Sequence, residues 1–199
     1  MRARRMAELA LAMAAPDTAR AQAALDVADA LIAEGLADRT VASELQYRRA
    51  QLSLALGDVD AAQRTVHALQ SEDSRFALAA QRLFFRHALR NWSQTRPVDP
   101  LQRDQTLSEE QQRSAQHLLS AGTTLLSSLD AQAGQDRAAD AEALHVCNSL
   151  VDALCALRFG ADDAQSGALG LALNQRILDA QPRDRDALRR AAELREASG

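Results

Sequence analysis

The sequence predicts an all-α fold in which antiparallel helical hairpins stack on one another, with about nine helices in total. Hydrophobic residues make up 47% of the chain but aromatic residues only 3%, so the core must be assembled from small contacts between closely packed helices. Alanine and leucine dominate and β-branched residues are few, which favours helix throughout. Apolar residues recur every three or four positions, and a Gly-Asp pair separates two such segments.

The clearest pattern lies in the segment Tyr47–Leu69, where one helix ends at a turn and another begins at once. Gly57 stands where the first helix must stop, because glycine adopts the left-handed conformation at little cost. Asp58 stands where an N-cap belongs, since its carboxylate can accept the free amides of the first turn. The connection is short enough to predict an antiparallel helix pair. One apolar stripe on the second helix comprises Val59, Ala62, Val66 and Leu69.

The other helices follow from the same spacing, taken in chain order. Pro16 ends a first helix and Asp17 caps a second. An irregular loop at 94–107 contains Pro97 and Pro100 and shows no period, so it is expected to pack over helix ends, to bind a ligand or to act as a hinge. The expected helices are about 3–15, 17–35, 38–57, 58–69, 75–93, 106–134, 137–159, 163–181 and 184–197.

The last four helices have distinct characters. Thr106 and Glu109 have the spacing of a capping box, which would start the sixth helix at residue 106. The seventh helix has little polar face and should be the most enclosed. It carries Cys147 and Cys155, which a helical rise would place roughly 12 Å apart, too far for a disulfide. The ninth helix is polar on most of its surface, as a terminal capping helix must be.

The central hairpin resembles a tetratricopeptide (TPR) repeat, a helix-turn-helix unit of about 34 residues. With Gly57 set on the turn glycine of the family, Ala50 and Ala62 fall on its two small positions and Val66 on its large apolar one. Tyr47 lies near the early aromatic residue of the family. The tryptophan, the Leu-Gly pair and the closing proline of the repeat are absent from this hairpin.

A second similarity lies downstream, and together the two cover about half of the chain. The segment around Gly160 resembles the segment around Gly57, and the two glycines are 160 − 57 = 103 residues apart, close to three repeat units. Pro182 then falls on the closing proline of the family. The interval between Gly160 and Pro182 is about five residues longer than the motif allows.

The TPR resemblance implies a short right-handed superhelix, an α-solenoid, forming a single domain over 1–199. It also implies a non-catalytic scaffold that binds a partner protein or peptide through the inner face of its first helices. Bacterial proteins of this kind serve in envelope assembly, polysaccharide export or secretion, and the abrupt helical start suggests a fragment of a larger protein. An ordinary solvated face is the alternative interpretation of the same positions. The residues on which the binding positions fall are Glu44, Tyr47, Arg48, Gln51, Asp186 and Arg189.

Net charge, short motifs and hydropathy argue against several other classes of function. The net charge of −4 argues against nucleic acid as a primary partner. The four histidines fall on four different expected helices, and no short-range motif predicts a metal, a cofactor or a catalytic group. No apolar run approaches the length of a membrane span. We expect a cytoplasmic protein, with the periplasm as the alternative if the chain belongs to an envelope protein; the oligomeric state stays open.

A second hypothesis comes from a different class of protein. A compact helical bundle could form an enzyme site or a small-ligand site only in three dimensions. The densest aromatic segment of the chain holds Phe84 and Trp92, and the most apolar helix holds Cys155. An apolar pocket near these three residues is therefore the expected location of such a site, while a role in the core is the simpler interpretation of the aromatic residues.

Overall fold

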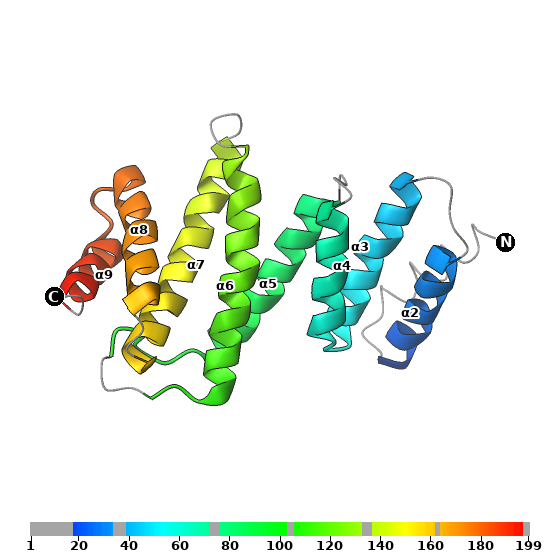
Figure 1. Cartoon of the computed structure of the whole chain (residues 1–199), viewed down its shortest axis with the longest axis horizontal. Coiled ribbons are helices and arrows are strands. Elements are labelled where there is room, and N and C mark those ends of the chain that lie inside the picture. The colour runs from blue at the N-terminus through cyan, green and yellow to red at the C-terminus, as the bar shows by residue number, and fades with distance from the viewer. Residues whose placement is uncertain are drawn as a thin grey trace. The chain divides into compact units, whose positions relative to one another are not determined.

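The computed structural model describes residues 18–33, 39–71, 76–102, 106–132, 137–161 and 164–196 (Figure 1). These ranges contain eight helices and no strand, and neighbouring helices pack against each other, so the all-α prediction is confirmed. The expected helix at 3–15 and its neighbours Pro16 and Asp17 lie outside the described residues. The helices are α2 (Thr18–Ala33), α3 (Arg39–Ala55), α4 (Val59–Ser71), α5 (Ala77–Thr95), α6 (Glu109–Asp130), α7 (Arg137–Ala161), α8 (Ala164–Ala180) and α9 (Arg185–Glu196).

The chain divides into two compact units, one ending at Phe84 and the other beginning at Phe85. Helix α5 therefore begins in the first unit and ends in the second. In the first unit, α2 packs on α3 and α3 packs on α4. Its core consists of the apolar faces of these helices: Ala24, Ala28, Leu45, Ala50, Leu52, Leu54, Ala62, Val66 and Leu69 are buried.

The turn between α3 and α4 has the structure that the sequence predicts. Gly57 has a φ of +79°, in the left-handed region. Its amide donates to the carbonyl of Leu54 at 3.1 Å, and the amide of Asp58 donates to the carbonyl of Ser53 at 2.9 Å. This pair of bonds defines a Schellman motif, which satisfies two carbonyls at the end of α3.

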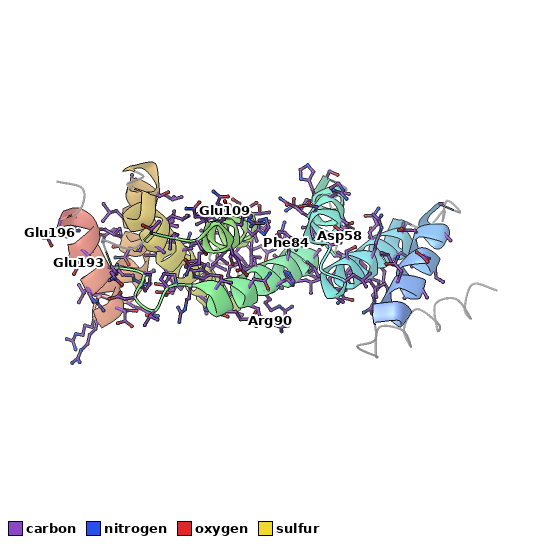
Figure 2. All side chains as sticks on the ribbon, turned by 90° about the horizontal axis from the view of Figure 1, so that it is seen from below. Asp58, Phe84, Arg90, Glu109, Glu193 and Glu196 are labelled. Atoms are coloured by element: carbon purple, nitrogen blue, oxygen red, sulfur yellow. The ribbon has the colours of Figure 1, made fainter. Side chains whose placement is uncertain are left out.

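The start of α4 is capped by Asp58, which is labelled in Figure 2. Its Oδ1 accepts the amide of Ala61 at 2.9 Å, and its carbonyl accepts the amide of Ala62 at 3.2 Å. The carboxylate therefore satisfies one of the free amides of the first turn, as an N-cap does. Gly57 and Asp58 together stop one helix and start the next within two residues.

One arginine connects α2, α3 and α4. Arg49 on α3 forms an ion pair with Asp29 on α2, with 2.5 Å between Nε and Oδ1. Its Nη1 donates to the hydroxyl of Thr65 on α4 at 3.4 Å. Because both arginine and aspartate are more than a third exposed, solvent weakens the ion pair, and the main contribution to stability comes from the buried apolar faces.

In the second unit, α6, α7, α8 and α9 pack in chain order, each on the next. Helix α7 lies between α6 and α8, and its buried positions include Val146, Cys147, Leu150, Val151, Leu154 and Cys155. The sequence predicts this helix to be the most enclosed of the chain, and its buried residues agree with a strongly enclosed helix. A close approach occurs at Gly122 on α6, where an added Cβ would lie 2.5 Å from Cδ2 of Leu150. Glycine at that position allows α6 and α7 to pack closely.

The expected capping box at the start of α6 is wrong by two residues. The N-cap is Ser108, whose hydroxyl accepts the amide of Gln111 at 3.2 Å while its own amide donates to Oε1 of Gln111 at 2.9 Å. The sequence fits the capping pattern in both registers, and the structure uses the later one, in which Leu107 is buried before the helix begins. Gln111 also donates to the carbonyl of Thr95 at 2.9 Å, which ties the start of α6 to the end of α5.

The downstream similarity to the central turn is not reproduced at Gly160. Helix α7 continues through Gly160 to Ala161, so this glycine does not end a helix as Gly57 does. The α8–α9 connection resembles the α3–α4 turn more closely, because Asp184 caps α9 as Asp58 caps α4: its Oδ1 accepts the amide of Ala187 at 2.9 Å. Pro182 is exposed in this connection.

Candidate functional site

The four binding residues predicted on α3 form one connected surface group, here called the α3 surface: Glu44, Tyr47, Arg48 and Gln51. Each of them lies three or four positions from two of the others, on a side of α3 that leaves all four half-buried. Arg48 is at the centre of the group. Its Nη2 lies 3.7 Å from Oε1 of Glu44, and its Nη1 donates to Oε1 of Gln51 at 3.3 Å. Its guanidinium carbon lies 6.0 Å from the centre of the Tyr47 ring.

The α3 surface also includes an aromatic contact that the sequence did not predict. The ring of Tyr47 stacks on the ring of Phe76, with centroids 5.7 Å apart and planes inclined by 21°. Phe76 lies just before α5 and is half-buried. The hydroxyl of Tyr47 makes no hydrogen bond to any other described residue. The tyrosine is therefore held by its ring while its polar end remains available.

The charges on the α3 surface are weakly held. The side chain of Arg48 is 40% exposed and that of Glu44 is 33% exposed, so their ion pair is screened by water and contributes less than about 1 kcal/mol. Such charges can exchange partners at small cost when another protein approaches. The surface offers an aromatic ring, a guanidinium and an amide, which are groups that protein interfaces commonly use.

The other two predicted residues, Asp186 and Arg189, lie on α9 and line a cavity of about 210 Å³ in the second unit. Three parts of this unit contribute to it: the segment after α5, helix α7 and helix α9. We call it the charged cavity, because five of its eight lining residues are ionisable acids or arginines. The lining residues are Asp99, Pro100, Leu101, Asp152, Cys155, Asp186, Arg189 and Arg190.

Arg190 is the most enclosed of the charged residues that line the charged cavity and is only 7% exposed. Its Nη1 donates to Oδ1 of Asp152 at 2.8 Å, and its Nη2 donates to Oδ1 of Asn148 at 2.6 Å. Arg96 approaches the other oxygen of Asp152 at 3.8 Å. These contacts hold α9 on α7, and sequence analysis missed them because Arg190 looked like one more polar residue of a terminal helix.

Arg189 and Asp186 are more exposed than Arg190. Arg189 donates from Nη2 to Oδ2 of Asp99 at 3.3 Å, and the other oxygen of Asp99 accepts the amide of Leu101 at 3.0 Å. Asp186 has no hydrogen bond or ion pair with another described residue. Among the charged residues of the cavity, the carboxylate of Asp186 is therefore the one without a partner in the described part of the chain.

Only one of the three residues of the second hypothesis lines the charged cavity. Phe84, Trp92 and Cys155 are all buried, at 5%, 1% and 0% exposed. Of the three, only Cys155 lines the charged cavity, whose other walls are mostly polar. Phe84, labelled in Figure 2, belongs to the first unit, and Trp92 and Cys155 belong to the second.

The remaining titratable groups are dispersed. The four histidines lie on α4, α5, α6 and α7, and no group of three potential metal ligands occurs among the described residues. Burial lowers the pKa of His87, and the nearby positive charges of Arg90 and His117 lower it further. Burial raises the pKa of the Cys147 thiol; the positive charge of Arg176 lowers this pKa by a smaller amount, and the negative charge of Asp130 raises it.

Comparison of the chain with family models, with curated proteins and with solved structures found no match. None of the described helices contains an apolar stretch of the length that a membrane span requires.

Proposed function

We propose that this protein is a non-catalytic scaffold of the TPR type and that it binds a partner protein through the α3 surface. The observation that carries the proposal is the Tyr47 ring, which is fixed against Phe76 while its hydroxyl has no partner in the described residues. A rigid, half-buried aromatic residue with a free polar end loses little side-chain entropy on binding. Such residues supply a large share of the energy in protein interfaces.

The surroundings of Tyr47 support a protein rather than a small molecule as the ligand. Arg48, Glu44 and Gln51 extend the group along two turns of α3, with the guanidinium near the tyrosine ring. Such a strip suits a helix or an extended peptide laid along it. The similarity of the α3–α4 hairpin to a TPR unit favours the same role, and the bacterial TPR proteins of assembly, export and secretion indicate the setting.

A pull-down with the intact chain from the source cell, followed by mass spectrometry, would identify the partner. Affinity would then be measured for Tyr47→Ala combined with Gln51→Ala, for Tyr47→Phe and for Arg48→Ala. The double variant is expected to weaken binding by about 1–3 kcal/mol. Tyr47→Phe keeps the stacked ring and removes only the hydroxyl, so it should lose a smaller part of the affinity.

Arg64→Ala is the matched control for Arg48→Ala, since Arg64 is an exposed arginine on α4 of the same unit. The control should bind as the unchanged protein does. If the α3 variants retain full affinity and remain folded by circular dichroism, the α3 surface is not the binding site and the proposal is wrong.

A further inference from the structure

We propose that the charged cavity binds the side chain of an arginine or lysine from the partner protein. This inference rests on the proposed scaffold function and adds a second contact, in the second unit, with a defined chemistry. The occupant would place its cationic group beside Asp186 and Asp99 and its methylene groups against Pro100 and Leu101. Three features of the cavity favour such an occupant: its charge, its size and the fixed position of Arg190.

The charge of the cavity favours a cation. Its lining contains three aspartates and two arginines, a formal charge of 2 − 3 = −1. Both arginines already have carboxylate partners, since Arg190 binds Asp152 and Arg189 binds Asp99. Asp186 has no partner among the described residues. Arg96, which lies outside the lining, also approaches Asp152, at 3.8 Å, so the carboxylate of the cavity that is left without a cationic partner in the described part of the chain is that of Asp186.

An anion fits the same cavity poorly. The two terminal nitrogens of Arg190 are used by Asp152 and Asn148. Its Nε is buried with no hydrogen-bond partner, and because protein atoms cover it, it offers no accessible donor to an incoming anion. Arg189 is accessible, with 60% of its side chain exposed, but an anion there would have to displace Asp99 and lie near Asp186.

The size of the cavity suits a single side chain. About 210 Å³ is less than the volume of typical pockets for drug-sized ligands, which begin near 300 Å³. Pro100 and Leu101 supply an apolar wall, as the methylene stem of arginine or lysine requires. Arg190 is held by two short hydrogen bonds, so its side of the cavity is already ordered before binding.

The test uses the full chain and a capped Gly-Arg-Gly tripeptide, with capped Gly-citrulline-Gly as the neutral analogue and capped Gly-Glu-Gly as the anion. Binding would be followed by NMR on the isotope-labelled protein. The arginine peptide should shift the amides of α9 and of residues 99–101 with millimolar affinity, and the other two peptides should not. Equal binding of the citrulline peptide, or preferential binding of the glutamate peptide, would overturn the inference.

Asp186→Asn should weaken binding of the arginine peptide by about five- to tenfold, because it removes the unpaired charge and preserves the shape. Asp60→Asn is a closely matched control. Like Asp186, Asp60 is exposed and is the second residue of a helix capped by an aspartate, so both changes remove the same favourable helix-end charge. The control should leave the affinity unchanged, and equal losses in both variants would contradict a local site.

Arg189→Gln gives an expectation of the opposite sign. It frees Asp99 and makes the cavity more negative, so binding of the arginine peptide should become several-fold tighter. A variant that merely damaged the cavity would bind the arginine peptide more weakly, and that result would count against the inference.

The tripeptide experiment does not report on binding at the α3 surface. If the arginine tripeptide does not bind while the Tyr47 variants lose affinity for the partner, only this inference is refuted. If the tripeptide binds as expected while the Tyr47 variants keep full affinity for the partner, only the proposed function is refuted.

Discussion

Replacement of Gly57 by alanine, valine or asparagine tests the turn that joins α3 to α4. Gly57 has a φ of +79°, which side-chain-bearing residues rarely adopt. A Cβ built on Gly57 meets no heavy atom of the described residues within 4 Å beyond its chain neighbours. The cost of substitution therefore comes from the backbone conformation alone, because there is no neighbouring group to collide with.

Because only the backbone conformation contributes, the loss of unfolding free energy can be estimated for each variant. The left-handed conformation costs an ordinary residue about 1–2 kcal/mol, which is the expected loss of unfolding free energy for Gly57→Ala. A β-branched residue is more restricted, so Gly57→Val should lose about 2–3 kcal/mol. Asparagine tolerates the left-handed conformation better, and Gly57→Asn should lose less than about 1 kcal/mol.

Urea denaturation followed by far-ultraviolet circular dichroism would measure the order of the three variants. Hydrogen exchange would locate the effect, which should appear first in peptides from 39–71, because Gly57 and Asp58 close the Schellman motif and cap α4. If alanine and valine were as stable as glycine, the turn would not need a left-handed residue. If all three variants lost the same unfolding free energy, the loss would not depend on how well each residue tolerates a positive φ. The left-handed conformation would then not be its cause.

Three further outcomes are expected. The two cysteines, both fully buried, should react slowly with a thiol reagent in the native state and rapidly in denaturant. Gly122→Ala should destabilise the protein by about 1–2 kcal/mol because its Cβ would displace Leu150, whereas Gly170→Ala, with contacts no closer than 3.7 Å, should be neutral or stabilising. Stability should fall as the pH drops below the ordinary pKa of histidine, and His87→Gln should reduce that fall.

The sign of the histidine effect follows from its lowered pKa. The folded protein binds a proton at His87 less readily than the unfolded chain does, so the stabilising contribution is complete above the unfolded pKa. It is lost as the pH falls toward the folded pKa. Asn91 supports the neutral ring, since its Nδ2 lies 3.1 Å from Nε2 of His87 and can only donate. Denaturation at several pH values would test this, and an unchanged profile in His87→Gln would contradict it.

Each of the other two expectations also has a clear contrary result. Fast native labelling of Cys155 would show that the charged cavity admits the reagent to the thiol, contrary to its burial. A stable Gly122→Ala variant would show that Leu150 can change rotamer at no cost, although it is fully buried.

The sequence alone was sufficient to place the described helices to within a few residues at each end, and the reason is local. Apolar residues at helical spacing, with Gly57 and Asp58 between two such segments, determine where one helix ends and the next begins, whatever the rest of the chain does. The same local rules failed where two registers were equally good. The capping pattern before α6 occurs at Thr106 and again at Ser108, and burial of Leu107 selected the second.

The sequence also placed Glu44, Tyr47, Arg48 and Gln51 on one side of α3, because helical spacing alone puts such residues together. Only the tertiary structure decided that Tyr47 stacks on Phe76, and that Asp186 and Arg189 share a cavity with Asp99 and Cys155. These contacts join residues from different helices, so they depend on how each helix is rotated and packed against its neighbours. The periodicity of one helix shows which of its residues share a side, but not which neighbouring helix that side faces. For this reason the charged cavity could be recognised only in the folded chain.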